Sequence, residues 1–93
     1  MRIAELFWND ANVNHLWAAH GVTPDEIEEI IFGIEGEPTV YRVLRDGDKY
    51  KIFGETGAGR LLLIVGSFLR DGRFRVFAAR DMETMEKRAY RAR

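Results

Sequence analysis

The stretch RFRVFAARDMETMEKRAYRAR, residues 73–93, changes its period in the middle and thereby decides the fold. An alternating apolar pattern over residues 74–79 indicates a β-strand with one buried face. From Asp81 or Met82 onward the spacing is that of a helix, which runs close to the C-terminus. The sequence therefore predicts a strand that is followed directly by a helix.

Three polar side chains in this stretch form a candidate site. Arg80 ends the strand, and Glu86 and Tyr90 are four residues apart, so both lie on one face of the helix. A guanidinium that faces a carboxylate and a phenol can hold a phosphate group and move protons around it. An ordinary salt-bridged helix cap would use the same residues, and the spacing leaves both interpretations open.

Length and composition restrict the class of protein. The 93 residues suffice for one domain, residues 1–93, with a single modest core. The content of 46% hydrophobic and 31% charged residues is typical of a soluble globular protein. Cysteine is absent, which excludes disulfide and thiolate chemistry. The longest apolar run, residues 61–65, is too short to span a membrane, and no targeting segment is visible. We expect a cytoplasmic protein without a cofactor.

Charge is distributed unevenly along the chain. Residues 1–41 contain one basic and eight acidic residues (−7), whereas residues 42–93 contain thirteen basic and seven acidic residues (+6), for a net charge of −1. This asymmetry predicts an electropositive face on the sheet and the last helix. Such a face binds either RNA or an acidic protein, and charge alone does not choose between them.

The N-terminal third predicts a short strand and two helices. Residues 3–8 are mostly apolar, and a helix that carries Leu16 and Trp17 on its apolar face then runs to His20-Gly21, where glycine suits the left-handed cap. Thr23-Pro24-Asp25-Glu26 opens a second helix with an N-cap, a proline at the first position and a capping box. The buried face of this second helix is predicted to consist of Ile27, Ile30, Ile31 and Ile34, and its end is predicted at Gly33, Gly36 and Pro38.

Period-two patterns and turns follow. Strands are predicted over residues 49–56, 60–68 and 74–79, and a further strand over residues 39–44 is left open. The nearly continuous apolar run of residues 60–68 predicts a central strand that is covered on both faces. Asp46-Gly47, Thr56 to Gly59 and Asp71-Gly72 mark the turns. The order β-α-α-β-β-β-β-α predicts an α+β protein: a twisted antiparallel sheet of three to four strands with two N-terminal helices and a C-terminal helix.

Two superficial motifs do not support a function. Gly54-x-x-Gly57-x-Gly59 precedes a strand instead of opening a helix, so a hairpin turn is the better interpretation than a phosphate cradle. His15 and His20 are five residues apart, about 140° around a helix, and do not share a metal-facing side. No metal site is predicted.

Two longer stretches together resemble the BrnT family of bacterial toxins, small RelE-like ribonucleases that pair with a ribbon-helix-helix antitoxin. The first stretch runs from Trp8-Asn9 to His20-Gly21-Val22. The second runs from Gly59-Arg60-Leu61 to Ala79-Arg80-Asp81-Met82 and on to Glu86 and Tyr90. The resemblance covers nearly the whole chain. It departs from the family at Asn12 and Ala19, where members usually carry lysines.

The resemblance implies metal-independent cleavage of RNA, which needs a base for the 2′-hydroxyl, cations for the phosphorane and an acid for the leaving oxygen. Arg80 would bind the phosphorane. Glu86 would act as the base or orient Arg80, and Tyr90 would donate a proton or stack on a base. His20 would be a general acid or base. For each residue, helix capping, ion pairing or packing is the alternative role.

The remaining cations define a candidate RNA-backbone surface. Arg60, Arg73, Arg75 and Lys51 occupy alternating or turn-flanking positions, and they form such a surface if they point to one side of the sheet. The alternative function is a non-catalytic module that docks an antitoxin or another acidic protein on its basic face. Whether the chain forms a homodimer is left open.

Overall fold

The computed structural model describes residues 3–8, 14 and 20–93. In this part of the chain it contains five strands and two α-helices: β1 (Glu5–Phe7), α2 (Pro24–Ile31), β2 (Val40–Asp46), β3 (Lys49–Glu55), β4 (Leu61–Phe68), β5 (Arg73–Asp81) and α3 (Thr84–Arg91). The helix predicted before His20, with Leu16 and Trp17, lies outside the described residues. No helix within the described ranges is long and apolar enough to span a membrane.

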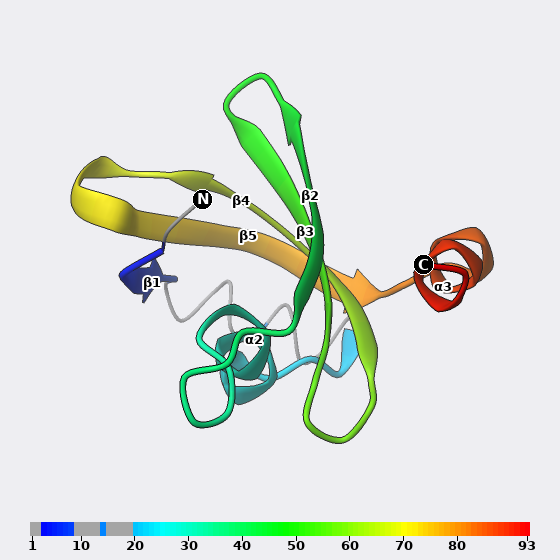
Figure 1. The fold of residues 1–93 in the computed structure, drawn as a ribbon. Coiled ribbons are helices and arrows are strands. Elements are labelled where there is room, and N and C mark those ends of the chain that lie inside the picture. Colours follow the sequence, from blue (N-terminus) through cyan, green and yellow to red (C-terminus); the bar gives the residue numbers. More distant parts are fainter. Residues whose placement is uncertain (1–2, 9–13, 15–19) are drawn as a thin grey trace.

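The strands form one sheet in the order β1-β5-β4-β3-β2 (Figure 1). Strands β2 to β5 pair antiparallel with their sequence neighbours, as predicted, and the strand left open at residues 39–44 is present as β2. The predicted count of three to four strands is wrong, because residues 5–7 add a fifth strand. This strand lies parallel to β5, with Leu6 opposite Phe74.

A helix covers each face of the sheet (Figure 1). On one face, α2 packs over a core that includes Ile30, Ile52 and Phe74. On the other face, α3 contributes Tyr90 to a smaller cluster of Phe53, Leu61, Leu63, Met82 and Tyr90. Strand β4 supplies both cores from alternate positions, which confirms the prediction that it is central and covered on both faces.

The start and the end of α2 agree with their sequence signals, but the predicted burial of Ile34 does not hold. Thr23 and Glu26 form the predicted capping box. The helix ends at Ile31 with Phe32 as its C-cap, because the next residue, Gly33, adopts a left-handed φ of 82°. Only glycine fits there, since a Cβ would collide with the backbone of Glu37. Ile34 therefore leaves the helix and is 57% exposed, so the prediction that it is buried is wrong.

Helix α3 begins two to three residues later than predicted. Strand β5 continues to Asp81, which pairs with Leu62, so that residue cannot start a helix. Glu83 is the N-cap instead, and its backbone N–H donates to the carboxylate of Glu86 at 2.7 Å. This bond fixes Glu86 in the first turn of α3, directly beside the end of β5.

Candidate functional site

The side chains of Arg80 and Glu86 join β5 to α3. Arg80 lies opposite Leu63, which places it on the sheet face that α3 covers. Its Nη1 donates to Oε1 of Glu86 at 2.8 Å, and its Nη2 donates to Oε2 at 3.2 Å. Nη1 also donates to the backbone carbonyl of Asp81 at 2.9 Å. The outer edge of the guanidinium is thus held in one orientation.

This pair keeps Glu86 ionised. The hydrogen bond from Arg80 is the main cause that lowers the pKa of Glu86 below its ordinary value, and the N–H of Glu83 and the charge of Lys51 act in the same direction. The same bond raises the pKa of Arg80. A carboxylate stabilised in this way is a weak base. The geometry therefore favours orientation of Arg80 as the role of Glu86 over proton abstraction.

The other edge of the Arg80 guanidinium is open. In the described part of the chain, Nε donates to no acceptor, and Nη2 keeps one hydrogen that is not bonded to Glu86. The 73% exposed side chain of Glu83 forms an ion pair with Nη2 at 3.7 Å, too far for a hydrogen bond. The Arg80 side chain is 33% exposed. Nε and Nη2 present two parallel N–H groups, a geometry that matches two oxygens of a phosphate.

Three of the four predicted RNA-binding cations share a face of the sheet with Arg80. Lys51 pairs with Val65, and Arg75 lies opposite Ser67, so both follow the alternation that places Leu63 under α3. Arg73 is two residues before Arg75 on the same face. Lys51 and Arg75 are exposed. We name Lys51, Arg73, Arg75 and Arg80 the cationic strand face.

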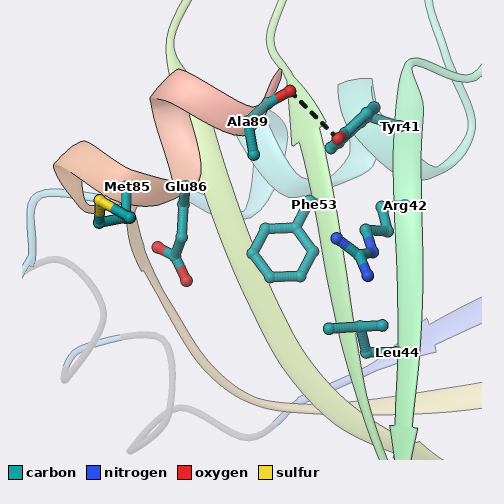
Figure 2. Close-up of a pocket in the computed structure, with 7 residues that line it drawn as sticks. All are labelled: Tyr41, Arg42, Leu44, Phe53, Met85, Glu86 and Ala89. Atoms are coloured by element: carbon teal, nitrogen blue, oxygen red, sulfur yellow. Dashed lines mark hydrogen bonds between the residues drawn. The ribbon is translucent and has the colours of Figure 1, made fainter. Parts of the chain in front are cut away.

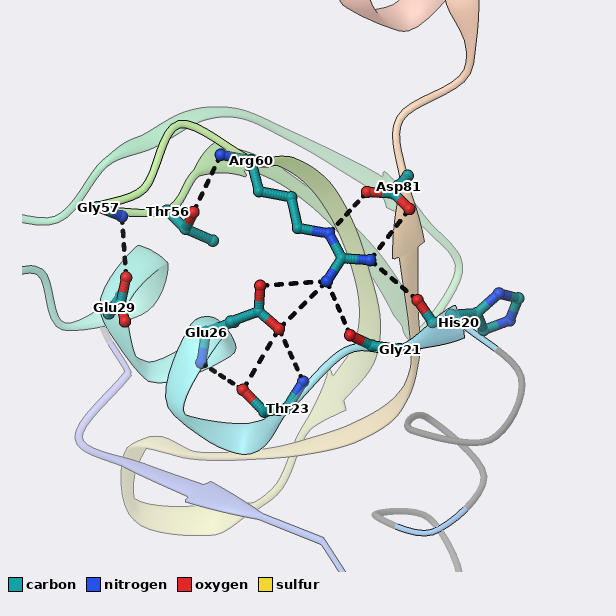
Figure 3. A network of polar contacts seen from close by, with 9 residues as sticks. All are labelled: His20, Gly21, Thr23, Glu26, Glu29, Thr56, Gly57, Arg60 and Asp81. Carbon is teal, nitrogen blue, oxygen red and sulfur yellow. Dashed lines mark hydrogen bonds and ion pairs between the residues drawn. The ribbon is translucent and has the colours of Figure 1, made fainter.

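Arg60, the fourth predicted cation, lies at a different place (Figure 3). Nε and Nη2 bind the Asp81 carboxylate at 2.7 and 3.0 Å. Nη1 donates to the Gly21 carbonyl at 2.8 Å and to Oε2 of Glu26 at 3.1 Å, and Nη2 donates to the His20 carbonyl at 2.9 Å. All five N–H groups of Arg60 are therefore bonded within the protein, and none is left for a phosphate.

Arg60 instead joins three segments. Its partners lie in the segment His20-Gly21, in the first turn of α2 and at the last residue of β5. The Asp81 hydrogen bond is the main cause that raises the pKa of Arg60 above its ordinary value. Sequence spacing gave no signal for this role, because the partners of Arg60 are 21 to 40 residues away.

His20 lies next to this network. Its backbone carbonyl takes part, while its exposed imidazole points away from Arg60 (Figure 3). The pKa of Asp81 is lowered chiefly by Arg60, with smaller contributions from Lys87 and His20. The imidazole is thus close to the side chain of Asp81, which lies on the sheet face opposite to Arg80.

Tyr90 is buried at 9% exposure and is not bonded to Arg80. Its hydroxyl donates to the carboxylate of Glu55, and this bond is the main cause that raises the pKa of Tyr90. The rings of Tyr41 and Tyr90 pack edge to face, with their centres 5.0 Å apart, and the Arg93 guanidinium lies 3.8 Å from the centre of the Tyr90 ring. Sequence reasoning missed Glu55, Tyr41 and Arg93, which carry no local motif.

A hollow of about 250 Å³ lies between β2 and α3 (Figure 2). Its floor is the ring of Phe53, with α3 residues on one side and β2 residues on the other. Glu86 belongs both to this hollow and to the Arg80 ion pair. The lining residues are Tyr41, Arg42, Leu44, Phe53, Met85, Glu86 and Ala89.

These elements define an α+β fold that is known from a ribonuclease toxin. The crystal structure of BrnT, a ribonuclease toxin of Brucella abortus, matches with a TM-score of 0.67 over 86% of this chain and 97% of that chain, at 13% sequence identity. No protein-family model and no curated protein matches the sequence. The chain thus has a BrnT-like fold, as the sequence resemblance implied.

Proposed function

We propose that the protein is the toxin of a bacterial type II toxin–antitoxin pair and a metal-independent endoribonuclease that cleaves RNA through attack of a 2′-hydroxyl. The open Nε–Nη2 edge of Arg80 on the cationic strand face carries this proposal. The fold shared with BrnT, a ribonuclease toxin, supports it.

In the proposed reaction, the RNA backbone lies along Lys51, Arg73 and Arg75, and the scissile phosphate meets Arg80. The 2′-hydroxyl gives up its proton and its oxygen forms a bond to phosphorus. The bond to the 5′-oxygen breaks, that oxygen takes up a proton, and a 2′,3′-cyclic phosphate remains. The phosphorane carries more charge on its oxygens than the substrate does, so the donors of Arg80 bind it more strongly. Glu86 holds the opposite edge, so that little reorientation is needed.

We propose the proton-transfer roles from the contacts of three side chains. Glu86 is a weak base because it accepts hydrogen bonds from Arg80 and from the backbone of Glu83. The Tyr90 hydroxyl is bound to Glu55, and its raised pKa keeps it protonated. We assign exchange of protons with the substrate to His20, whose exposed imidazole lies near the end of β5.

RNA profiling after induced expression tests the activity. Cells that express the wild type should accumulate cleaved transcripts, and cells that express Arg80→Ala should not. Arg91→Ala is the matched control, because Arg91 is an exposed arginine on α3 outside the site. If the wild-type chain is folded, free of antitoxin and inert on RNA both in cells and after purification, the ribonuclease proposal is wrong.

A non-catalytic protein-binding module on the same fold is the second candidate function. The observation that favours it is the apolar hollow beside α3, in which Met85 is 69% exposed and Leu44 is 39% exposed. Exposed apolar side chains gathered in one place are typical of docking surfaces. An inert but folded wild-type chain would favour this function.

For the partner, we propose a ribbon-helix-helix antitoxin whose acidic segment covers the cationic strand face. Co-purification from the native operon should recover a second, short protein. Charge reversal at Arg75 and Lys51 should weaken the complex, and the weakening should decrease at high salt because both side chains are exposed. Recovery of the chain alone, from cells that tolerate it at high level, would contradict the pairing.

A further inference from the structure

We propose that the hollow between β2 and α3 is a pocket for one unpaired nucleobase of an RNA strand, next to the phosphate that Arg80 binds. This inference rests on the proposed function, because it places the base and the reacting phosphate on the same strand.

The size and floor of the hollow suit one planar ring. Its volume of about 250 Å³ is below the roughly 300–1,000 Å³ of sites that take larger ligands. The Phe53 ring lies at its centre, between Ala89 of α3 and Leu44 of β2 (Figure 2). Single-stranded RNA is commonly recognised by stacking of splayed bases on aromatic side chains.

Two charged groups at the rim can bond the polar edge of a base. The Glu86 carboxylate lies on one side of the Phe53 ring, and the Arg42 guanidinium lies on the other (Figure 2). A carboxylate accepts from the amino and imino groups of bases, and a guanidinium donates to their carbonyl and ring nitrogen atoms. The rim therefore offers both an acceptor and a donor around an apolar floor.

The surroundings favour an anionic strand as the occupant. Glu86 connects the hollow to Arg80, so a phosphate on the open edge of Arg80 is one side chain away from the pocket. Lys51 pairs with Leu44 across β2 and β3 and is exposed beside it. Lys51 and Arg80 would thus neutralise the phosphates on either side of the bound base.

Filling the pocket tests the proposal. Ala89 lines the hollow and is exposed on α3, so Ala89→Leu should occupy the space without disturbing the core. Thr84→Leu adds the same side chain to the outward side of the same helix and is the matched control. Circular dichroism and thermal unfolding confirm that both variants are folded.

The probe is a short single-stranded oligonucleotide of 2′-O-methyl RNA, which lacks the attacking hydroxyl and is not cleaved. Ala89→Leu should bind it roughly 10- to 100-fold more weakly than the wild type, and Thr84→Leu should bind it as the wild type does. Replacement of bases by abasic sites, one position at a time, should weaken binding strongly at one position. That position should lose its importance in Ala89→Leu.

Each outcome separates the pocket from the activity. The pocket proposal is overturned if Ala89→Leu binds the oligonucleotide and cleaves unmodified RNA as the wild type does, which leaves the ribonuclease proposal intact. It is also overturned if Ala89→Leu loses only a protein partner, because the hollow is then a protein-docking site. If the wild type does not cleave RNA but the abasic-site result holds, the pocket stands and the ribonuclease proposal fails.

Discussion

The Arg80 guanidinium and the Glu86 carboxylate meet edge to edge, at N···O distances of 2.8 and 3.2 Å, although one residue lies on β5 and the other on α3. The same two hydrogen bonds attach α3 to β5 and orient the guanidinium of Arg80 for its proposed role. Its consequences can be measured separately as stability and as activity.

Acid should weaken the attachment of α3. The pKa of Glu86 lies below its ordinary value of 4.5 because of Arg80. Its stabilising contribution is therefore present above that value and is lost as the pH falls through the lower folded-state pKa. We expect the wild type to lose stability more steeply than Glu86→Gln between about pH 5 and about pH 3. Thermal unfolding across this range measures the difference, with exposed Glu28→Gln as the control. Parallel curves for the wild type and Glu86→Gln would contradict the role of the pair.

Replacement of Arg80 by lysine should remove most of the ribonuclease activity although the charge is kept. An ammonium cannot bind Glu86 and a phosphorane with two parallel pairs of N–H groups. We expect kcat to fall by about 10²-fold or more, with a smaller change in KM. Arg75→Lys on the same face should reduce kcat much less, because we expect Arg75 to interact with the RNA backbone only through its charge. Equal losses in the two variants would show that Arg80 acts only through its charge.

Arg60 should prove structural. Arg60→Lys breaks most of the hydrogen bonds to Asp81, Glu26 and two carbonyls, so we expect the free energy of unfolding to fall by about 1–3 kcal/mol. The salt dependence of RNA binding distinguishes this from a phosphate contact. Removal of a true contact, as in Lys51→Ala, should reduce the slope of log K against log salt by about 0.7, whereas Arg60→Lys should leave that slope unchanged. A reduced slope for Arg60→Lys would show that Arg60 does contact a phosphate of the RNA.

Two isoleucines on the same segment should respond in opposite ways to aspartate. Ile30 is fully buried beneath the sheet, so Ile30→Asp places an unpaired charge in the core and should prevent folding. The milder Ile30→Ala should cost about 2–5 kcal/mol. Ile34 is 57% exposed, and Ile34→Asp should change stability by about 0.5 kcal/mol or less. Chemical denaturation compares them. A native-like Ile30→Asp protein would be incompatible with the position of α2.

The Tyr90–Glu55 hydrogen bond should make the stability of the protein depend on pH a second time, in the alkaline range. The pKa of Tyr90 is raised above 10.0 chiefly by Glu55, so the bond contributes below pH 10 and is lost as the pH rises through the higher folded-state value. Tyr90→Phe should be less stable than the wild type by about 1 kcal/mol at neutral pH, and the gap should close in alkali. Its activity should fall less than that of Arg80→Lys. A collapse of activity without a loss of stability would place the hydroxyl in the reaction.

The parts of the fold that sequence predicted are those set by local chemistry. Thr23 and Glu26 are three residues apart, so their capping box is visible as a pattern. The apolar run of β4 likewise shows that both faces are covered. Gly33 marks the end of α2 in the same way, whereas the burial of Ile34 was mispredicted because the isoleucine spacing continues past that glycine.

The parts that could not be predicted depend on pairs that are distant in the chain. Arg60 is a turn-flanking cation by pattern, and only the folded chain brings Asp81 and Glu26 to it. The hydroxyl of Tyr90 donates to Glu55, which is 35 residues away in the sequence. Arg80 and Glu86 were proposed as a pair because they are only six residues apart, but no pattern could show which edge of the guanidinium stays open.

The parallel pairing of β1 with β5 has a consequence for synthesis on the ribosome. Glu5 lies opposite Arg73, so the first strand has no partner in the sheet until β5 has been made. The hairpins of β2, β3 and β4 are local and can form earlier. We therefore expect the nascent chain to hold residues 5–7 unpaired until β5 emerges, and to complete its sheet late and in one step.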